Sequence, residues 1–358
     1  MGRNKSNFVD LCQGDFGRKT AYTGVAQITT ENVVQVLSDT IGTHNRNRMM
    51  INYLYRYYKG DQPILYREKL VRPEVNNRVV ENHALEVVKF KAGQIYGEPI
   101  QYVCKKKKAD KKINEQVDLL NDYLDEANAD ARNIQLGIYQ SAVGTAYKAI
   151  LREDDWTKDS DLPPFRIFIP YPGDVYIVYS KNTGKAMLSV QILKDEENQQ
   201  YYLCYSSNQY FKVKNGQVTV SGINGFDGIP IIEYPNNHDR LSDVEIAITA
   251  FDAINKYQSD RLNGVEQFVQ AFMKFKNCEI DENEFLKMVK LGAISVKDAG
   301  NGVQSDVDLM TAELNQSESQ VAKDDIYNNM LIVEAMPNRQ SNTGGDTGNA
   351  VYLRNGWG

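Results

Sequence analysis

The fold is decided by residues 241–275, which read LSDVEIAITAFDAINKYQSDRLNGVEQFVQAFMKF. Ser242 and Glu245 form an S-x-x-E capping box, a typical helix start, and apolar side chains recur at helical spacing behind it. This pattern predicts one helix about 50 Å long. Its apolar stripe exceeds what a small domain covers, so it needs a helix bundle or a neighbouring subunit. We therefore expect three aromatic residues to lie between subunits: Phe251, Phe268 and Phe272.

A small insert follows this helix. A capping pair, Asp281 and Glu284, predicts a short helix that Gly292 ends. Residues 293–296 and 303–310 have the pattern of two short strands. Between Glu279 and Glu313 the insert is otherwise acidic, and its basic residues there are Lys287, Lys290 and Lys297.

A second long helix is predicted after the insert. Its start is a cap formed by Ser317 and Gln320, and Pro337 ends it. Residues 337–350 form a loop rich in glycine and amide side chains. The apolar pattern restarts at 351–353, which predicts an element cut short at the end of the chain.

The part before residue 241 mixes helices and strands. Residues 1–28 are polar and glycine-rich, so we expect an extended or mobile arm. Helices are predicted from about residue 31 to Gly60, over 77–96 and over 113–127, with a short strand at 100–104. Three strand-like runs, 187–194, 200–205 and 209–214, precede an Asn215-Gly216 hairpin signal. The region is therefore α+β with an antiparallel meander.

Two basic features have competing interpretations. The run Lys105–Lys108 either contacts phosphates or an acidic partner, or is a solvated loop, and a single short run favours the loop. The tyrosines and arginines at 46–58 either stack on nucleic acid or line an amphipathic helix, and their helical spacing favours the helix.

Composition limits the protein class. The 358 residues carry 41 Lys and Arg against 47 Asp and Glu, a net charge of −6, and they predict roughly two domains. Residues 241–358 hold 10 basic and 18 acidic residues, a net charge of −8. No apolar run approaches the roughly 18 residues of a membrane span, and residues 1–10 lack the apolar core of a signal peptide. The 4 cysteines form no C-x-x-C pair, so neither disulfides nor zinc are expected.

No catalytic constellation stands out. Residues 14–20 are similar to a phosphate loop but lack its spacing and a preceding strand. Asp306 and Asp308 share one face of a predicted strand. They could bind a cation, but a metal site needs more ligands, so a solvated strand face is favoured. We expect no cofactor, no metal and no enzymatic activity.

Short motifs occur in a fixed order along most of the chain: YYKGD at 57–61, NNR at 76–78, GQIYGEPI at 93–100, IPIIEY at 229–234 with NN at 236–237, SD at 242–243, YQSDRLN at 257–263, MP at 336–337 and TGNA at 347–350. In this order the set resembles the portal protein of tailed bacteriophages, in the group from phages of Gram-positive hosts. The long helix after the loop, present in that family, is absent here, so the chain resembles a C-terminally shortened portal protein.

The resemblance implies a division of the chain. Residues 1–28 are an N-terminal arm, 29–240 a wing, 241–275 a stem helix, 276–316 a clip, 317–336 a second stem helix, and 337–358 a tunnel loop with the start of the next helix. The implied fold is α+β, with an α/β wing containing the antiparallel meander, long stem helices and a small helix-plus-hairpin clip.

The resemblance also implies a function: a ring-shaped channel for double-stranded DNA at one capsid vertex of the virion, assembled in the host cytoplasm, for genome packaging, retention and ejection. The implied partners are identical copies in a dodecameric ring, the terminase, a head-completion adaptor, and the major capsid and scaffolding proteins, with no membrane. The lysines at 287, 290 and 297 are expected to face the motor or adaptor. The expected DNA-channel residues are Asn338, Arg339, Gln340, Asn342 and Thr343.

Two other classes compete with the portal hypothesis. One is a helical scaffold or adaptor of a virion that uses its long helices as a rod without a DNA channel. The other is a nucleotide-dependent enzyme that uses residues 14–20 and its Lys19. A ring with a central hole distinguishes the portal from the rod, and nucleotide binding would identify the enzyme.

Overall fold

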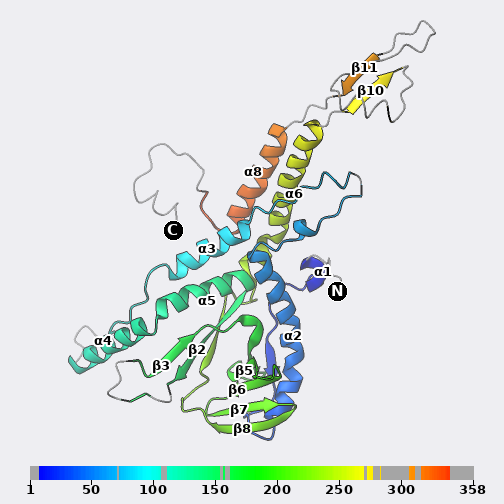
Figure 1. The fold of residues 1–358 in the computed structure, drawn as a ribbon. Helices are drawn as coiled ribbons and strands as arrows, with labels where there is room; N and C mark the ends of the chain where they lie inside the picture. Colours follow the sequence, from blue (N-terminus) through cyan, green and yellow to red (C-terminus); the bar gives the residue numbers. More distant parts are fainter. Residues whose placement is uncertain are drawn as a thin grey trace. The chain divides into compact units, whose positions relative to one another are not determined.

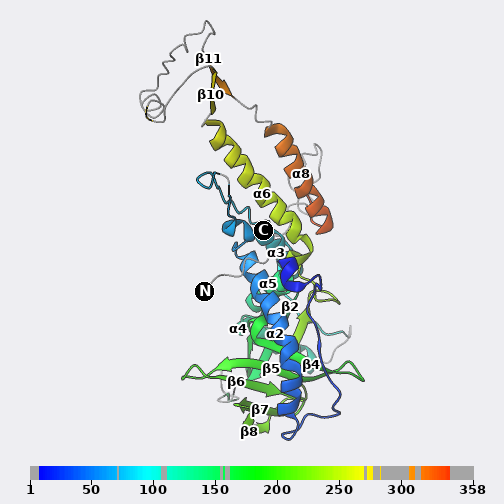
Figure 2. The ribbon, with the colours of Figure 1, turned by 90° about the vertical axis from the view of Figure 1, so that its right-hand side faces the viewer.

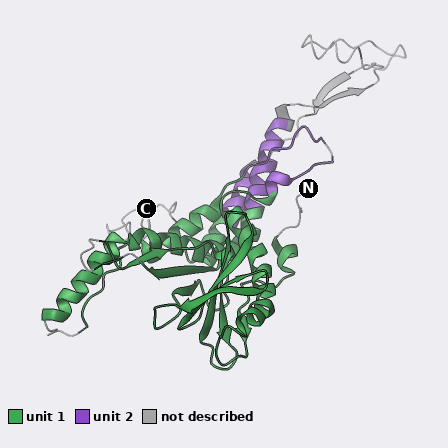
Figure 3. Ribbon diagram, turned by 60° about the horizontal axis from the view of Figure 1, so that its bottom comes forward, with its two compact units in different colours: residues 1–63, 80–252, 327–358 green, residues 64–79, 253–326 purple. Residues whose placement is uncertain are grey.

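The computed structural model describes residues 8–70, 72–105, 111–153, 156–157, 162–269, 272–276, 283, 306–310 and 316–338. The chain divides into two compact units (Figure 3). Unit 1 comprises residues 1–63, 80–252 and 327–358, and unit 2 comprises residues 64–79 and 253–326.

The larger sheet of unit 1 has six strands in the order β1-β4-β5-β6-β7-β8. From β4 onward it is the predicted antiparallel meander, and β7 and β8 meet at Asn215 and Gly216, whose φ angles of 51° and 74° suit a tight hairpin turn. β1 joins as a parallel neighbour of β4. The strands are β1 (Ala21–Thr23), β4 (Val175–Ser180), β5 (Ala186–Lys194), β6 (Gln200–Tyr205), β7 (Gln209–Lys214) and β8 (Gln217–Ile223).

Helix α2 (Val33–Tyr58) packs against this sheet (Figures 1 and 2). Val36 and Leu37 of the helix share a buried cluster with Val178 and Leu188 of the sheet. Gly60, with a φ of 94°, lies directly after the helix. The prediction of a helix from about residue 31 to Gly60 is confirmed.

A second, three-stranded sheet has the order β3-β2-β9, with β2 (Thr145–Arg152) antiparallel to both β3 (Phe165–Phe168) and β9 (Ile231–Pro235). Three helices accompany it in unit 1: α3 (His83–Tyr96), α4 (Lys111–Glu126) and α5 (Ala129–Val143). Short 3-10 turns occupy Pro63–Tyr66 and Pro172–Asp174.

Two local expectations for this region are wrong. The helix predicted over 77–96 begins only at His83, where the Asn82 side chain accepts a hydrogen bond from the Leu85 N–H. Residues 100–104 are irregular rather than a strand, because Asn121 of α4 bonds both the N–H and the carbonyl of Tyr102 and none of the described strands pairs with the segment. Helix α5 lies where no element was predicted. Its Gly137 is required by packing, since a Cβ there would lie 2.5 Å from the Tyr96 ring.

The N-terminal segment is not a free arm. Helix α1 (Phe8–Cys12) buries Phe8 and Cys12 in the core, and Phe8 packs on the Tyr53 ring at 5.3 Å between centroids. Strand β1 then enters the larger sheet. One apolar pair in a polar, glycine-rich stretch is too weak a periodic signal to predict this, and tertiary burial decides it.

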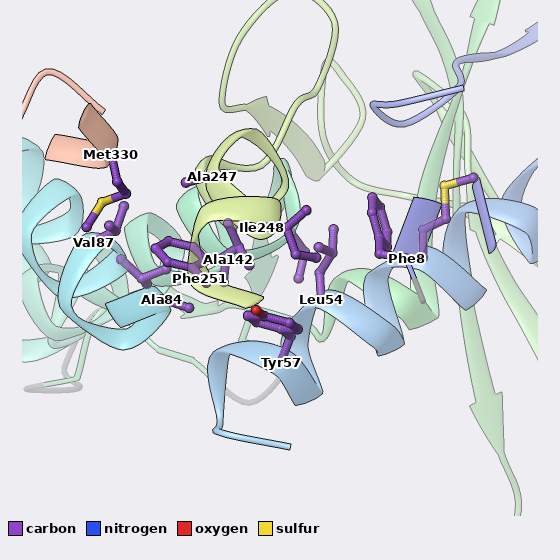
Figure 4. Close-up of a cluster of buried hydrophobic side chains, with 14 of the residues drawn as sticks. Phe8, Leu54, Tyr57, Ala84, Val87, Ala142, Ala247, Ile248, Phe251 and Met330 are labelled. Carbon is purple, nitrogen blue, oxygen red and sulfur yellow. The ribbon is translucent and has the colours of Figure 1, made fainter. Parts of the chain in front are cut away.

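The main core of unit 1 is helical. Side chains from several helices that are far apart in the sequence meet in one buried cluster, part of which is drawn in Figure 4. The labelled members are Phe8, Leu54, Tyr57, Ala84, Val87, Ala142, Ala247, Ile248, Phe251 and Met330. The first turns of the helix that begins at Asp243 therefore belong to the core of this unit.

Helix α6 (Asp243–Val269) and helix α8 (Gln316–Val333) run side by side in Figures 1 and 2. The prediction of a second long helix over 317–336 is confirmed. The prediction that α6 continues to residue 275 is wrong, because α6 ends at Val269 and β10 (Phe272–Lys276) follows.

Strand β10 pairs antiparallel with β11 (Asp306–Met310). The register places Lys274 opposite Asp308 and Lys276 opposite Asp306. Residues 272–276 are therefore paired in a strand rather than continuing α6. The side chains of Asp306 and Asp308 lie outside the described residues.

Candidate assembly interface

The start of α6 is capped as the sequence predicts. The Glu245 N–H donates to Ser242 Oγ at 3.3 Å, and the Ser242 N–H donates to Glu245 Oε2 at 3.2 Å. Ser242 Oγ also donates to the carbonyl of Ala142 at 2.8 Å. The capping box thus fastens the first turn of α6 to the end of α5.

The Glu245 carboxylate also holds the N-terminal segment. It accepts a hydrogen bond from the Gly17 N–H at 2.7 Å, and Arg18 Nη2 donates to both of its oxygens at 2.8 and 2.7 Å. The side chains of Arg18 and Glu245 are 1% and 0% exposed. Burial lowers the pKa of Arg18, and the facing carboxylate opposes that shift.

This contact argues against a phosphate-binding loop at residues 14–20. Gly17 and Arg18 are committed to Glu245, and Lys19 Nζ lies 2.6 Å from Asp15 Oδ1. Gly17 has a φ of 83°, and a Cβ there would lie 2.2 Å from the carbonyl oxygen of Asp239. The segment is therefore a packed connection whose cations already face carboxylates.

A second ion pair supports the turn before α6. Arg240 Nε donates to Glu233 Oε1 at 2.7 Å, and Tyr179 and Thr145 also donate to this carboxylate. Burial alone would raise the pKa of Glu233, but the hydrogen bonds and charge of Arg240 leave it lowered. Asn236 Nδ2 donates to Asp243 Oδ1 at 3.0 Å, which joins the turn to the helix.

Phe251 is not available for a contact between subunits. It is 1% exposed in the single chain and packs beside Tyr57, with 6.3 Å between the ring centroids (Figure 4). The prediction for Phe251 is therefore wrong: helices of its own chain cover this part of the apolar stripe.

The buried side of α6 within unit 2 is polar. Asn255 and Ser259 are both 0% exposed, and Asn263 is 4% exposed. The Val79 N–H donates to Ser259 Oγ at 2.9 Å, and the Asn77 N–H donates to Asn263 Oδ1 at 2.7 Å. Residues 64–79, named here the strap, thus cover this side of α6 with directional hydrogen bonds.

Another side of α6 stays open. Tyr257, Leu262 and Val265 are 41%, 39% and 41% exposed, although all three lie in the same helix as the buried amides. In α8, Val321 is 60% exposed. These four partly exposed apolar side chains are named here the outer row.

Helix α8 is tied to both units by side-chain contacts. In unit 2, Lys323 Nζ donates to Gln258 Oε1 at 3.2 Å, and Arg261 bonds Gln320. In unit 1, Tyr327 Oη donates to Glu86 Oε1 at 3.0 Å, and its ring lies 4.8 Å from the His83 ring. The end of α8 is thereby placed against α3.

Glu334, just after α8, is a buried carboxylate that sequence patterns do not reveal. Its side chain is 1% exposed, and Oε2 lies 3.8 Å from Lys91 Nζ. Burial, followed by the charge of Asp243, raises its pKa to about 7, while Lys91 opposes the shift. A titratable group therefore sits at the entry to the loop that begins at Pro337.

The remaining predicted site residues are only partly placed. Asn338 Nδ2 donates to Asn328 Oδ1 at 2.8 Å, and Phe272 opens β10. Phe268 lies in the last turns of α6, but its side chain is outside the described residues. Also outside them lie Lys287, Lys290, Lys297, Arg339, Gln340, Asn342 and Thr343.

The described ranges contain neither a membrane-spanning helix nor a cluster of metal ligands. No helix there combines the length and apolarity needed to cross a lipid bilayer. Within the same ranges, no three His, Cys, Asp or Glu side chains gather as a metal site would require.

Comparisons with known proteins add independent findings. The model of a family described as "Phage portal protein, SPP1 Gp6-like" matches residues 37–353. None of the curated proteins matches the chain significantly. Among solved structures, one chain from "Neck of native GTA particle computed with C12 symmetry" is similar with a TM-score of 0.42 and 12% identity, covering 74% of this chain and 67% of that chain.

Proposed function

We propose, from the premise that this chain belongs to the SPP1 Gp6-like phage portal protein family, that identical copies form a ring-shaped DNA channel at one capsid vertex. By its family the protein is a structural component of the phage particle and not an enzyme. The proposed ring, with twelve subunits as the expected number, serves genome packaging, retention and ejection. Assembly takes place in the host cytoplasm.

The outer row carries this proposal. The strap covers one side of α6 in unit 2, while Tyr257 and Val265 on the same helix keep about two fifths of their surface exposed. Apolar surface of this kind is stabilised by a neighbour. Because one copy would present the row to a different surface of the next copy, the contact is heterologous and closes into a ring.

Phe268 extends the outer row in this proposal. At roughly 100° per residue, positions 257, 265 and 268 fall within about 80° of one another around a helix. We expect Phe268→Asp and Tyr257→Asp to prevent ring formation, because a subunit contact that buries an unpaired charge loses several kcal/mol. Phe272, at the start of β10, is proposed as a further contact.

The experiment is size-exclusion chromatography combined with negative-stain microscopy. Thr249→Asp is the matched control, since Thr249 is an exposed polar residue of the same helix. Rings from the control and folded monomers from Tyr257→Asp support the proposal. Normal rings from both row variants contradict it, and rod-shaped particles from the unmodified chain favour the alternative of a helical scaffold or adaptor.

The loop from residue 337 is proposed to contact DNA passing through the channel. Asn338, Gln340, Asn342 and Thr343 supply neutral hydrogen-bonding groups beside the cation of Arg339. Such groups contact phosphates without reading sequence, and the net charge of −8 over residues 241–358 limits tight binding. DNA should therefore slide rather than be held.

Packaging by variant rings tests the loop. Changing Gly344 and Gly345 to proline should stall DNA translocation or retention, because glycine permits backbone conformations that proline forbids. Arg339→Ala should have a smaller effect. Normal packaging by both variants, in rings of normal size, would reduce the loop to a linker.

The insert between the long helices is proposed to be the clip that faces the terminase and then the head-completion adaptor. Its lysines, Lys287, Lys290 and Lys297, are the proposed contacts in an acidic insert. Reversing the charge of Lys287 and Lys290 should weaken terminase binding without affecting ring formation. Unchanged terminase-driven packaging would contradict this role. Capsid and scaffolding proteins are the remaining proposed partners.

A further inference from the structure

Helix α4 of unit 1 has a surface that the chain leaves uncovered. None of its residues is buried, although its apolar and polar residues segregate to different sides. Ile113, Leu119 and Leu120 are 42%, 48% and 38% exposed. In Figures 1 and 3 the helix extends away from the rest of unit 1, beyond the start of α5.

The segment before α4 adds to this surface. Asn121 accepts a hydrogen bond from the Tyr102 N–H at 3.1 Å and donates one to the Tyr102 carbonyl at 3.0 Å. This pair holds three exposed apolar residues beside the helix. The α4 patch is defined as Ile100, Tyr102, Val103, Ile113, Leu119 and Leu120.

The charges of α4 oppose its dipole. Lys111 and Lys112 begin the helix, while Asp122, Asp125 and Glu126 lie at its end. A helix prefers acids at its N-terminus and bases at its C-terminus. Of the other long helices, α3, α5, α6 and α8 have an acid in the first turn and α2 has none. The run Lys105–Lys108 directly precedes α4 and extends the basic end in the sequence.

We propose that the α4 patch binds an amphipathic helix of another protein, one that runs parallel to α4 with acidic residues at its N-terminal end and basic residues at its C-terminal end. Ordinary helices have this charge order because it suits their own dipole. Laid parallel to α4, such a helix meets opposite charges at both ends. Laid antiparallel, it meets like charges.

The described helices of a second copy of this chain fit less well. Helices α3, α5, α6 and α8 have acids in the first turn but no base in the last, and α2 has a base in the last turn but no acid in the first. Two α4 helices place opposite charges against each other only when they run antiparallel, related by a two-fold axis. Such an isologous contact does not propagate around the proposed ring, and this step alone rests on that ring.

The test uses a synthetic amphipathic peptide of about 20 residues, with a leucine stripe, glutamates in its first turn and lysines in its last. A photo-crosslinker at its N-terminus reports its direction on the full-length protein. Binding is measured by fluorescence anisotropy. We expect crosslinks near Lys111–Ile113, and affinity about tenfold lower for Leu120→Asp.

Two controls make the test specific. Gln217→Glu adds one negative charge at an exposed position of β8 and should bind the peptide normally. A charge-swapped α4, with Lys111 and Lys112 changed to Glu and Asp122 and Asp125 changed to Lys, should move the crosslinks to Tyr123–Glu126. All variants should form particles of the same size as the unmodified protein.

Several results would overturn the proposal. These are absence of peptide binding, binding that Leu120→Asp does not weaken, and crosslinks at the C-terminal end of unmodified α4. Crosslinks between α4 helices of two copies would identify a second copy as the occupant instead.

Discussion

The two halves of α6 are buried in different ways. The first half, in unit 1, is held by apolar packing around Phe251 and by the buried pair of Arg18 and Glu245. The second half, in unit 2, buries Asn255, Ser259 and Asn263, two of which bond the backbone of the strap. Apolar burial is non-directional, whereas hydrogen bonds fix register. The first half of α6, named here the anchor, is thus stabilised mainly by burial. In the second half, hydrogen bonds fix the position of the strap along the helix.

The largest effect is expected at the anchor's ion pair. Arg18→Met leaves the Glu245 carboxylate buried and without its cation, which should destabilise the protein by about 3–5 kcal/mol. Denaturant unfolding followed by circular dichroism measures this. Restoring a cation with Arg18→Lys should recover part of the loss. If Arg18→Met unfolds at the same denaturant concentration as the unmodified protein, the stability of the anchor does not depend on the Arg18–Glu245 ion pair.

A similar but slightly smaller loss is expected from Phe251→Ala, about 3–4 kcal/mol, because the variant leaves a cavity in the core. Tyr257→Ala on the same helix removes a ring that is 41% exposed and should cost below about 1 kcal/mol. Thermal unfolding of the unassembled chains compares the two. Equal losses would contradict the distinction between the buried side and the outer row.

Substitutions in the polar second half of α6 should destabilise the protein less. Asn263→Ala leaves the Asn77 N–H without its acceptor, at a cost of about 1–3 kcal/mol. Hydrogen exchange at the strap should rise while exchange in the larger sheet stays unchanged. Uniformly faster exchange in both regions would show that the strap and the core unfold together.

The smallest effect is expected from the titration of Glu334. Its pKa is raised from 4.5 to about 7 in the folded chain, so folding favours the protonated form. Stability associated with this group is present below about pH 4.5 and is lost as the pH rises through about 7. Glu334→Gln should therefore be more stable than the unmodified chain at pH 8 and similar at pH 4. Parallel melting curves for the two proteins at both pH values test this.

Local patterns predicted much of the fold. Helix α2, the meander with its Asn215-Gly216 turn, the capping box at Ser242 and the second long helix are all encoded by neighbouring residues. Prediction from periodicity failed where the same apolar pattern is compatible with both a helix and a strand. The apolar residues at 272–275 fit a helix as well as a strand, and pairing with residues 306–310 selected the strand.

The candidate interface was predicted less well. The apolar stripe indicated the helix, but periodicity cannot distinguish a side chain covered by its own chain from one that stays exposed. Phe251 and Tyr257 both belong to α6, yet the first is 1% and the second 41% exposed. The difference depends on which elements pack there.

The sequence by itself determined helix α2, the second long helix, the meander and the family, because periodicity, turn residues and ordered motifs are properties of contiguous segments. Tertiary structure alone decided that Gly17 and Arg18 bind Glu245, more than two hundred positions away, that the strap covers α6, and that Glu334 is buried. The physical reason is that these contacts arise from burial and charge pairing between distant segments, and no local pattern marks a residue for a partner so far along the chain.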